Sequence, residues 1–197
     1  MKHLLARLLV LVLPLVLPAA AWAEKPDPMF TEAEEADFAG AGDHLCQQAL
    51  GLEFLLPPPG FKVNKPAQEK LVKTLREPGP SAWGWVWLNE EKGQLIVLEM
   101  VKGPATADDF LYFADKVEKG FGGATGFTVE NREAETLKQP FRFELKAKLA
   151  NGNAFDFSCV STPARHRDPA VACIVTFAPD HDALAKIRQS LSFSGCR

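Results

Sequence analysis

The segment FDFSCVSTPARHRDPAVACIVTF, residues 155–177, contains two runs of alternating apolar side chains around a proline-bracketed loop. The apolar positions are Phe155, Phe157 and Cys159 in the first run and Cys173, Val175 and Phe177 in the second. A period of two residues is typical of β-strands. Antiparallel pairing with Cys159 opposite Cys173 sets all six side chains on one face, so one register both forms a disulfide and builds a core. A slip of one residue would spoil both, so this register is favoured.

The sequence has four cysteines, an even number that predicts two disulfides in an exported protein. If Cys159 pairs with Cys173, then Cys46 and Cys196 remain as the second pair. A zinc site is disfavoured because the two cysteines of the loop are far apart in sequence and enclose a single histidine, His166. We therefore expect structural disulfides and no metal site.

Residues 1–23 have the pattern of a secretory signal peptide. A basic start with Lys2 and Arg7 leads into a short apolar run, and Ala21-Trp22-Ala23 has the small-x-small form of a cleavage site. The apolar run is too short to span a bilayer comfortably, so no integral membrane anchor is expected. This pattern predicts a protein of the periplasm or the extracellular medium.

Cleavage after Ala23 would leave 174 residues, a length that suits one domain. We predict an N-terminal helical segment over 24–50, with a capping box that begins at Thr31, followed by a single α+β domain over 51–197. The net charge of −3 becomes about −5 once Lys2 and Arg7 are removed. Because the basic residues do not cluster, nucleic acid is not an expected partner.

The rest of the chain predicts an antiparallel sheet with helices on its faces. Strands are expected over 52–63 around a proline turn and over 83–88 and 94–101 as a hairpin. Residues 141–178 should form a three-stranded meander, in which 141–149 is the first strand and the alternating runs 155–159 and 173–177 belong to the other two. The stretch 94–101 is apolar on both faces apart from Glu99, as expected of a covered central strand. A loop over 151–153 should pair Leu149 with Phe155. Residues 64–82 fit either a short strand or a loop.

Two further helices are expected within the domain. One begins at Thr106 as N-cap and ends near Gly120 or Gly122, so GFGGATG (120–126) is a helix stop and turn that precedes a strand. The other begins at Asp180 or Asp182 and runs through LSF to residue 193, with His181 near its cap.

This order of elements resembles the PsbP-like fold family. The resemblance rests on PPPGFKV, on the tryptophan-rich hairpin, on the helix DDFLYFADKV and on the closing segment ALAKIRQSLSF, and it spans about residues 50–193. It implies an α+β protein with an antiparallel sheet flanked by helices, whereas the expected disulfides follow from the cysteine pattern and are not a feature of the family. It also implies a binding or assembly role rather than catalysis, with no cofactor, and it transfers no site residue. Exported bacterial proteins of unknown role share this fold.

Trp83, Trp85 and Trp87 are three indoles on one face of a single strand. As a functional feature they predict a surface for an apolar ligand or a partner protein. As a structural feature they would form core beneath a neighbouring element. Exposure of all three would cost an amount comparable to the stability of a domain, so the structural alternative carries weight.

No catalytic motif rises above chance in this sequence. The serine-hydrolase elbow, the zincin helix, the P-loop and the dinucleotide fingerprint are all missing. We therefore predict a non-catalytic exported module that binds a protein partner or an apolar small molecule. The alternatives are a small hydrolase assembled around the 160–172 loop, with His166 and Asp168 as candidates, and a purely structural envelope protein.

Overall fold

The computed structural model describes residues 38–41, 44–47, 51–69, 82–102, 106–164 and 169–194. The predicted signal peptide, residues 1–23, lies outside this part of the chain. The strands and helices are β1 (Phe38–Ala41), β2 (His44–Gln47), β3 (Leu52–Leu55), β4 (Lys62–Val63), β5 (Ala82–Asn89), β6 (Gln94–Lys102), α3 (Ala107–Thr125), β7 (Phe127–Glu135), β8 (Arg142–Leu149), β9 (Ala154–Ser161), β10 (Ala170–Ala178), α4 (Ala185–Ser190) and β11 (Ser192–Phe193). A further short helix covers 65–69.

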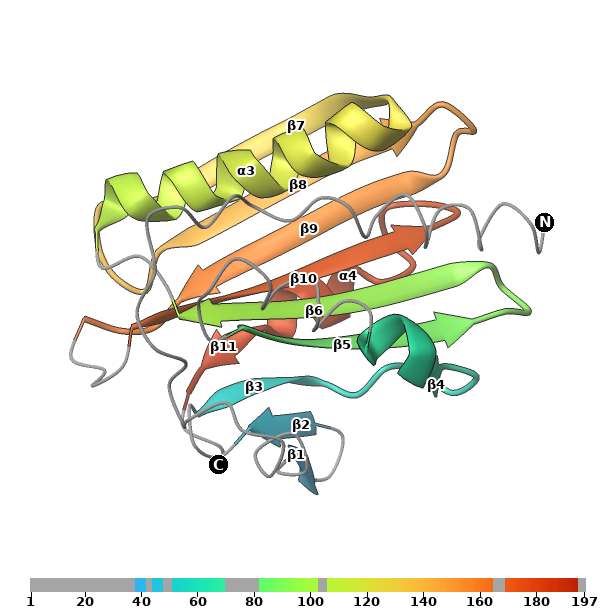
Figure 1. The fold of residues 1–197 in the computed structure, drawn as a ribbon, viewed down its shortest axis with the longest axis horizontal. Helices are drawn as coiled ribbons and strands as arrows, with labels where there is room; N and C mark the ends of the chain where they lie inside the picture. The colour runs from blue at the N-terminus through green and yellow to red at the C-terminus, as the bar shows by residue number, and fades with distance from the viewer. Residues whose placement is uncertain are drawn as a thin grey trace.

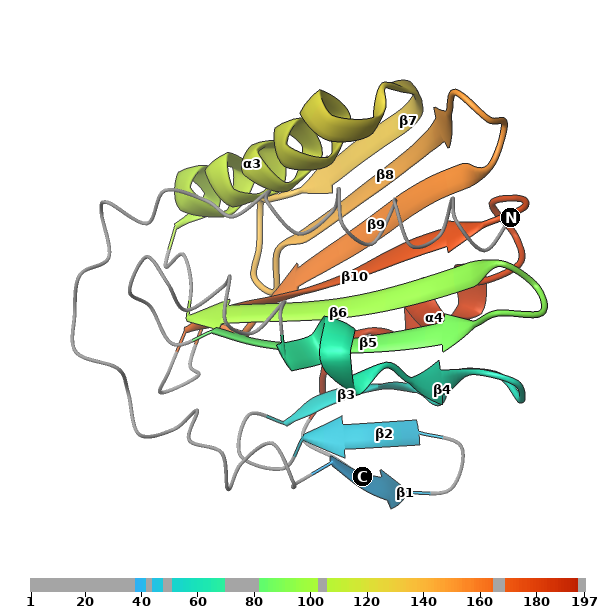
Figure 2. The same cartoon turned by 45° about the vertical axis from the view of Figure 1, so that its right-hand side comes forward.

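The strands form two antiparallel sheets (Figures 1 and 2). The larger has seven strands in the order β4-β5-β6-β10-β9-β8-β7, and the smaller has four in the order β1-β2-β3-β11. Helix α3 runs along the β7 and β8 end of the large sheet, whereas α4 lies behind its centre. The predicted α+β class, with an antiparallel sheet flanked by helices, is confirmed.

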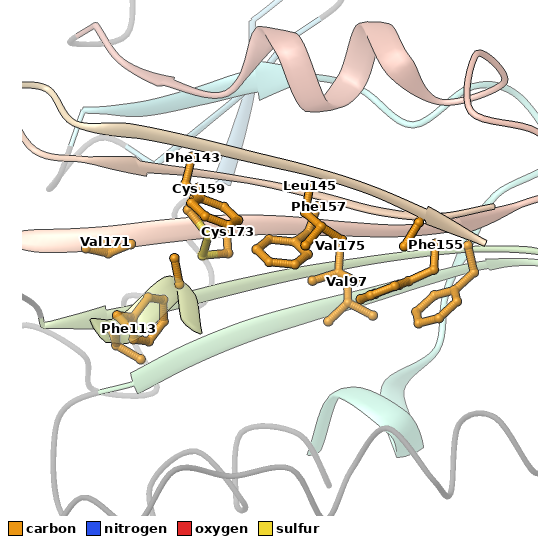
Figure 3. Packing of buried hydrophobic residues seen from close by; sticks show 14 of the residues in the cluster. Val97, Phe113, Phe143, Leu145, Phe155, Phe157, Cys159, Val171, Cys173 and Val175 are labelled. Atoms are coloured by element: carbon orange, nitrogen blue, oxygen red, sulfur yellow. A yellow bond between two sulfur atoms is a disulfide. The ribbon is translucent and has the colours of Figure 1, made fainter. Parts of the chain in front are cut away.

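The predicted register of the central hairpin is confirmed. Cys173 pairs with Cys159, Val175 with Phe157 and Phe177 with Phe155. The two cysteines are joined by a disulfide. Figure 3 shows the sulfur bridge in line with the aromatic side chains of the same face. The crosslink and the core therefore depend on the same alignment of two strands.

One face of the large sheet forms the first core, which α3 covers from outside. Phe110 and Ala114 of α3 are fully buried against it, and Phe113, labelled in Figure 3, belongs to the same cluster. The sheet contributes an aromatic row that includes Phe143, Phe155, Phe157 and Phe177. Stacked pairs such as Phe143–Phe157, with ring centroids 5.3 Å apart, fill this layer.

The opposite face of the large sheet forms the second core against the small sheet and α4. Leu52 and Phe54 of β3 and Leu184, Ile187 and Leu191 around α4 are buried there. Strands β6 and β10 contribute Ile96, Leu98, Met100, Ala172 and Ile174 to the same cluster. Because β6 and β10 are covered on both faces, their sequences are apolar at nearly every position.

The helical segment predicted over 24–50 is wrong where the structure describes it. Residues 38–41 and 44–47 are strands β1 and β2, and β2 pairs with β3. Glycines at 40 and 42 would each cost about 1 kcal/mol inside a helix, whereas an extended chain adds to β3 and buries Cys46. Cys46 is disulfide-bonded, and its predicted partner Cys196 lies outside the described residues.

The turn between β8 and β9 differs from the expected one by a single residue. Leu149 N–H donates to the carbonyl of Asn153, and β9 pairs with Ala147 at Phe155 rather than with Leu149. Gly152 takes the positive φ of 85° that closes the loop, a conformation easier for glycine than for Asn153. The register moves by two residues, so every side chain keeps its predicted face.

Both predicted helices have different ends in the structure. Thr106 caps α3 as expected, since its Oγ1 accepts from the N–H of Asp109. The helix then continues to Thr125 and stops at Gly126, whose φ is 60°. The closing helix is shorter than expected at both ends, because α4 begins at Ala185 rather than at Asp180 or Asp182 and ends at Ser190. Ser192 and Phe193 form β11, which pairs with β3. Residues 65–69 of the 64–82 stretch are helical, and 70–81 lie outside the described part.

We expect the double variant Cys159→Ala/Cys173→Ala to lose about 3 kcal/mol in the free energy of unfolding, because the disulfide closes a loop with a separation of 14 residues. Urea unfolding of the oxidised protein and the variant measures this difference. A loss well under about 1 kcal/mol would show that strand pairing alone fixes the register.

Candidate functional site

The tryptophan strand β5 contributes to the second core. Trp87 is 5% exposed, stacks on Trp85 with centroids 5.6 Å apart and meets Phe54 edge-on at 5.8 Å. Trp85 is half-buried beside the same cluster. Trp83 belongs to β5, but its side chain lies outside the described part of the chain. Trp87 is therefore a core residue, and the ligand-binding role of the tryptophan strand stays a prediction that falls mainly on Trp85.

On the other face of the same hairpin, Glu99 is an acid among apolar side chains. It alternates with Val97 and Val101, both of which belong to the first core, so its side chain points to the α3 side of the sheet. Gly84 lies opposite it on β5 and the disulfide-bonded Cys173 lies opposite it on β10. Among the described residues, no hydrogen bond or ion pair reaches the carboxyl, although the residue keeps partial exposure.

The apolar surroundings of Glu99 change its acidity. Burial raises the pKa of the Glu99 carboxyl from 4.5 to about 7, since the charged form loses water and gains no partner. At neutral pH the side chain therefore exchanges between a neutral hydrogen-bond donor and an anion. A carboxyl that titrates near pH 7 is a recurrent feature of functional sites.

A second buried acid, Asp156 of β9, lies beside two basic side chains on the opposite face of the sheet. Its side chain is 1% exposed, and its Oδ2 lies 3.0 Å from Nη2 of Arg188, which is 5% exposed. Arg188 also donates to Thr176 Oγ1 at 2.7 Å and to the carbonyl of His181 at 2.8 Å. Burial lowers the pKa of Arg188, and the Asp156 carboxylate opposes that shift. The cluster fastens α4 to the centre of the large sheet.

His181 connects this cluster to the edge of the sheet. Its Nδ1 lies 2.7 Å from Asp156 Oδ1, and its Nε2 lies 2.7 Å from Oε2 of Glu130 on β7. Glu130 also pairs with Lys148 of β8 at 3.0 Å, and this hydrogen bond is the main reason that the pKa of Glu130 is lowered. Both ring nitrogens thus face carboxylates, so neither is available to activate a nucleophile. The arrangement acts as a structural clasp.

The catalytic candidates of the 160–172 loop cannot be placed. His166 and Asp168 lie outside the described residues, so the hydrolase alternative stays untested. Within the described ranges, no cluster of three or more His, Cys, Asp or Glu side chains is arranged to hold a metal ion. The same part of the chain has no helix that is both long and apolar enough to cross a membrane.

Sequence reasoning found Glu99 only as an irregularity and missed the Asp156 cluster. The sequence signal for Glu99 was its position as the single acid within the apolar run QLIVLEMV. The Asp156 cluster draws on β9, β10 and α4, and no local pattern connects these segments. The prediction that His181 takes part in helix capping is wrong, because the N-cap of α4 is Leu184 and no side chain caps the helix. Asp180 instead closes the preceding turn, where its Oδ1 accepts from the N–H groups of residues 182 and 183.

Glu99 should make stability fall with rising pH. The unfolded chain releases this proton near pH 4.5 and the folded protein near pH 7, so the folded state binds more protons within that window. The free energy of unfolding therefore decreases across it, by about 3 kcal/mol in total. We expect the advantage of Glu99→Gln over the wild type to grow by this amount between pH 4 and pH 8 in urea unfolding. Parallel pH profiles for the two proteins would contradict the assignment, and Glu91→Gln in the exposed β5–β6 turn is the control.

Asp156→Ala should cost about 3 to 5 kcal/mol, because it leaves the buried Arg188 cation without its partner. The double variant Asp156→Ala/Arg188→Met should lose less than the sum of the single losses, as a double-mutant cycle by chemical denaturation will measure. Glu130→Gln, at the exposed end of the same chain of contacts, is the matched control and should cost much less. Additive losses would mean that the ion pair is not coupled.

Comparison with known proteins finds matches only among solved structures. No protein-family model matches the chain, and no curated protein matches it. The chain is similar to the PsbP protein of the cyanobacterium Synechocystis sp. PCC 6803, with 15% identity and a TM-score of 0.47 over 78% of this chain and 95% of that one.

Two other solved structures match at similar levels. The Ran-binding protein Mog1p of Saccharomyces cerevisiae has 15% identity and a TM-score of 0.39 over 72% of this chain and 79% of its own. LpqN of Mycobacterium tuberculosis, which is involved in cell envelope biogenesis, has 18% identity and a TM-score of 0.41 over 72% and 82%. At these identities and scores the likeness concerns the fold alone.

Proposed function

We propose that this protein is an exported, non-catalytic binding module that holds a largely apolar ligand on the α3 side of the large sheet, with Glu99 as its polar contact. Export is supported by the signal-like residues 1–23 and by the Cys159–Cys173 disulfide, since disulfides persist in oxidising compartments. The role is that of a carrier or accessory protein rather than an enzyme.

This proposal is carried by the carboxyl of Glu99, which has no hydrogen bond or ion pair with any of the described residues. A glutamate at the centre of an apolar sheet face lowers the stability of the fold, and a glutamine or a leucine would avoid that cost. Residues that lower the stability of the fold without a compensating interaction are commonly functional. A purely structural envelope protein would have no use for such a group, so this observation favours a ligand.

The neighbours of Glu99 favour binding over catalysis. Across the strands it faces Gly84 and Cys173, and along β6 it lies between Val97 and Val101. A glycine, two valines and a sulfur already in a disulfide offer neither a nucleophile nor a second acid or base. One ionisable group in apolar surroundings is instead the arrangement by which binding sites orient a mostly hydrophobic ligand.

The chemistry of Glu99 also indicates the polar group of the ligand. An ionised carboxylate on an apolar face gains most from a cationic donor, because a charge-assisted hydrogen bond offsets its lost hydration. We therefore expect an apolar body that bears a protonated amine. Gly84 contributes no side chain opposite Glu99, so β5 does not screen the carboxyl from such a group.

The tryptophan strand remains a second proposed contact region. Trp85 and Trp87 alternate with Val86, a first-core residue, so the indoles lie on the face opposite Glu99. The half-buried Trp85 is held in place by stacking on Trp87, which makes it a rigid apolar platform for a protein partner or an apolar ligand.

A titration with decylamine below its micelle concentration tests the Glu99 site. Isothermal calorimetry should show about tenfold tighter binding at pH 8 than at pH 6, because the amine binds the ionised carboxylate, whose population rises as the pH passes about 7. Decanol, of equal length and without charge, should show no such pH dependence.

The variants separate the possible outcomes of this titration. Glu99→Gln should weaken decylamine binding at pH 8 by at least about tenfold and remove its pH dependence, whereas Glu91→Gln should leave both unchanged. Trp85→Phe should have little effect, because its indole lies on the other face. Equal affinity of the wild type and Glu99→Gln, or no saturable binding of decylamine, would overturn the proposal.

A further inference from the structure

Strand β7 is an open edge of the large sheet. It stands last in the strand order and pairs only with β8 among the described strands. Eight of its nine residues are exposed, which is unusual beside the buried strands β9 and β10. The other edge is the two-residue strand β4, which is too short to serve as a template. A long open edge presents a row of backbone donors and acceptors to another chain.

Contacts from both faces hold β7 in a fixed position. On one face, Arg132 pairs with Asp115 and Glu118 of α3 and lies 5.1 Å above the ring of Phe143. On the other, Glu130 is held by His181 and Lys148. A strand fixed in this way loses little conformational entropy when a partner adds to it.

The regular part of the edge is Asn131–Glu135. A bulge at Glu130 interrupts the register between Val129 and Asn131, and beyond it the five residues pair continuously with β8. The bulge blocks edge pairing in the first half of β7 and leaves the second half as a short extended template. The fully exposed Leu137 follows this template directly and offers an apolar anchor.

The charges of this template are unbalanced. Glu133 lies directly opposite Glu144 of β8, and like charges at opposed positions destabilise a sheet. Glu135 lies opposite Arg142 and so faces a cation across the strand pair. Glu133 accepts a hydrogen bond from the neutral amide of Asn131, but its directly opposed residue in the described sheet is an acid rather than a cation. A cationic side chain on the outer side of Glu133 would relieve the repulsion between the two glutamates.

The same charges disfavour a second copy of this chain as the partner. Antiparallel self-pairing about a two-fold axis places residues of equal parity opposite each other. Registers centred on residues 132, 133 and 134 then oppose Arg132 to Arg132, Glu133 to Glu133, or Glu133 to Glu135. Each register brings like charges together, so the edge is protected against itself and open to a segment of opposite charge.

We propose that the Asn131–Glu135 edge of β7 binds an extended, basic segment of a partner protein, which adds to the large sheet as a further strand. Backbone hydrogen bonds hold the segment, and lysine or arginine side chains at alternate positions face Glu133 and Glu135. This surface lies at the far end of the sheet from β5 and is independent of the site at Glu99.

The probe is a peptide of about ten alternating threonine and lysine residues, long enough to span the template. Calorimetry should detect its binding, and amide hydrogen exchange should slow within residues 131–135 but not at β4 or β5. A peptide of alternating threonine and glutamate should not bind. Binding without protection of β7 amides, or protection without peptide as the protein is concentrated, would overturn the proposal.

Charge reversal provides the specificity test. Glu133→Lys/Glu135→Lys should weaken binding of the lysine peptide at least about tenfold and allow the glutamate peptide to bind. Glu90→Lys/Glu91→Lys, in the exposed β5–β6 turn, changes the net charge equally and should have little effect. Equal losses in the two double variants would show that only the overall charge matters, and would refute strand addition at β7.

Discussion

The pairing of β9 with β10 is the constraint on which the rest of the fold depends. The Cys159–Cys173 disulfide permits one register, and that register sends alternate side chains of both strands into two different cores. A slip of β9 by one residue would send its side chains to the opposite faces, placing Asp156 among the phenylalanines beneath α3. Because β6 and β8 pair directly with these strands, their alignment follows from the same crosslink.

The two buried acids of the large sheet show how differently one residue class can be accommodated. Asp156 is almost completely enclosed, yet it has Arg188 and His181 within hydrogen-bonding distance and so is compensated. Glu99 is less enclosed but has no partner among the described residues, and its pKa rises to about 7. Burial alone therefore does not distinguish a structural acid from one proposed to bind a ligand. The presence or absence of a compensating group does.

The local parts of the fold could be predicted from the sequence, and the long-range parts could not. The alternation around Cys159 and Cys173 determined both the strands and their register, because one spacing satisfied two requirements. Strand β2 was mistaken for helix because its stability comes from pairing with β3, which a local pattern does not contain. The same holds for the two-residue strand β11. Its sequence continues the helical pattern of α4, but it is extended because it pairs with β3. The sequence showed Glu99 as a single acid in an apolar strand. Its environment could not be inferred without the strand pairing, which places Gly84 and Cys173 beside it.

The position of the disulfide bears on the cost of Glu99. Cys173 lies directly across from Glu99, so the covalent crosslink is in the strand pair next to the unfavourable charge. A crosslink of this loop length contributes about 3 kcal/mol, and ionisation of a carboxyl whose pKa has risen to about 7 costs a similar amount. The stability that the crosslink contributes therefore offsets the free-energy cost of the ionised carboxylate. The crosslink also opposes a local separation of the strands, which would let water reach the carboxylate. A sheet held together in this way can keep an ionised glutamate on its apolar face without opening around it, which is the property that the proposed ligand contact at Glu99 requires.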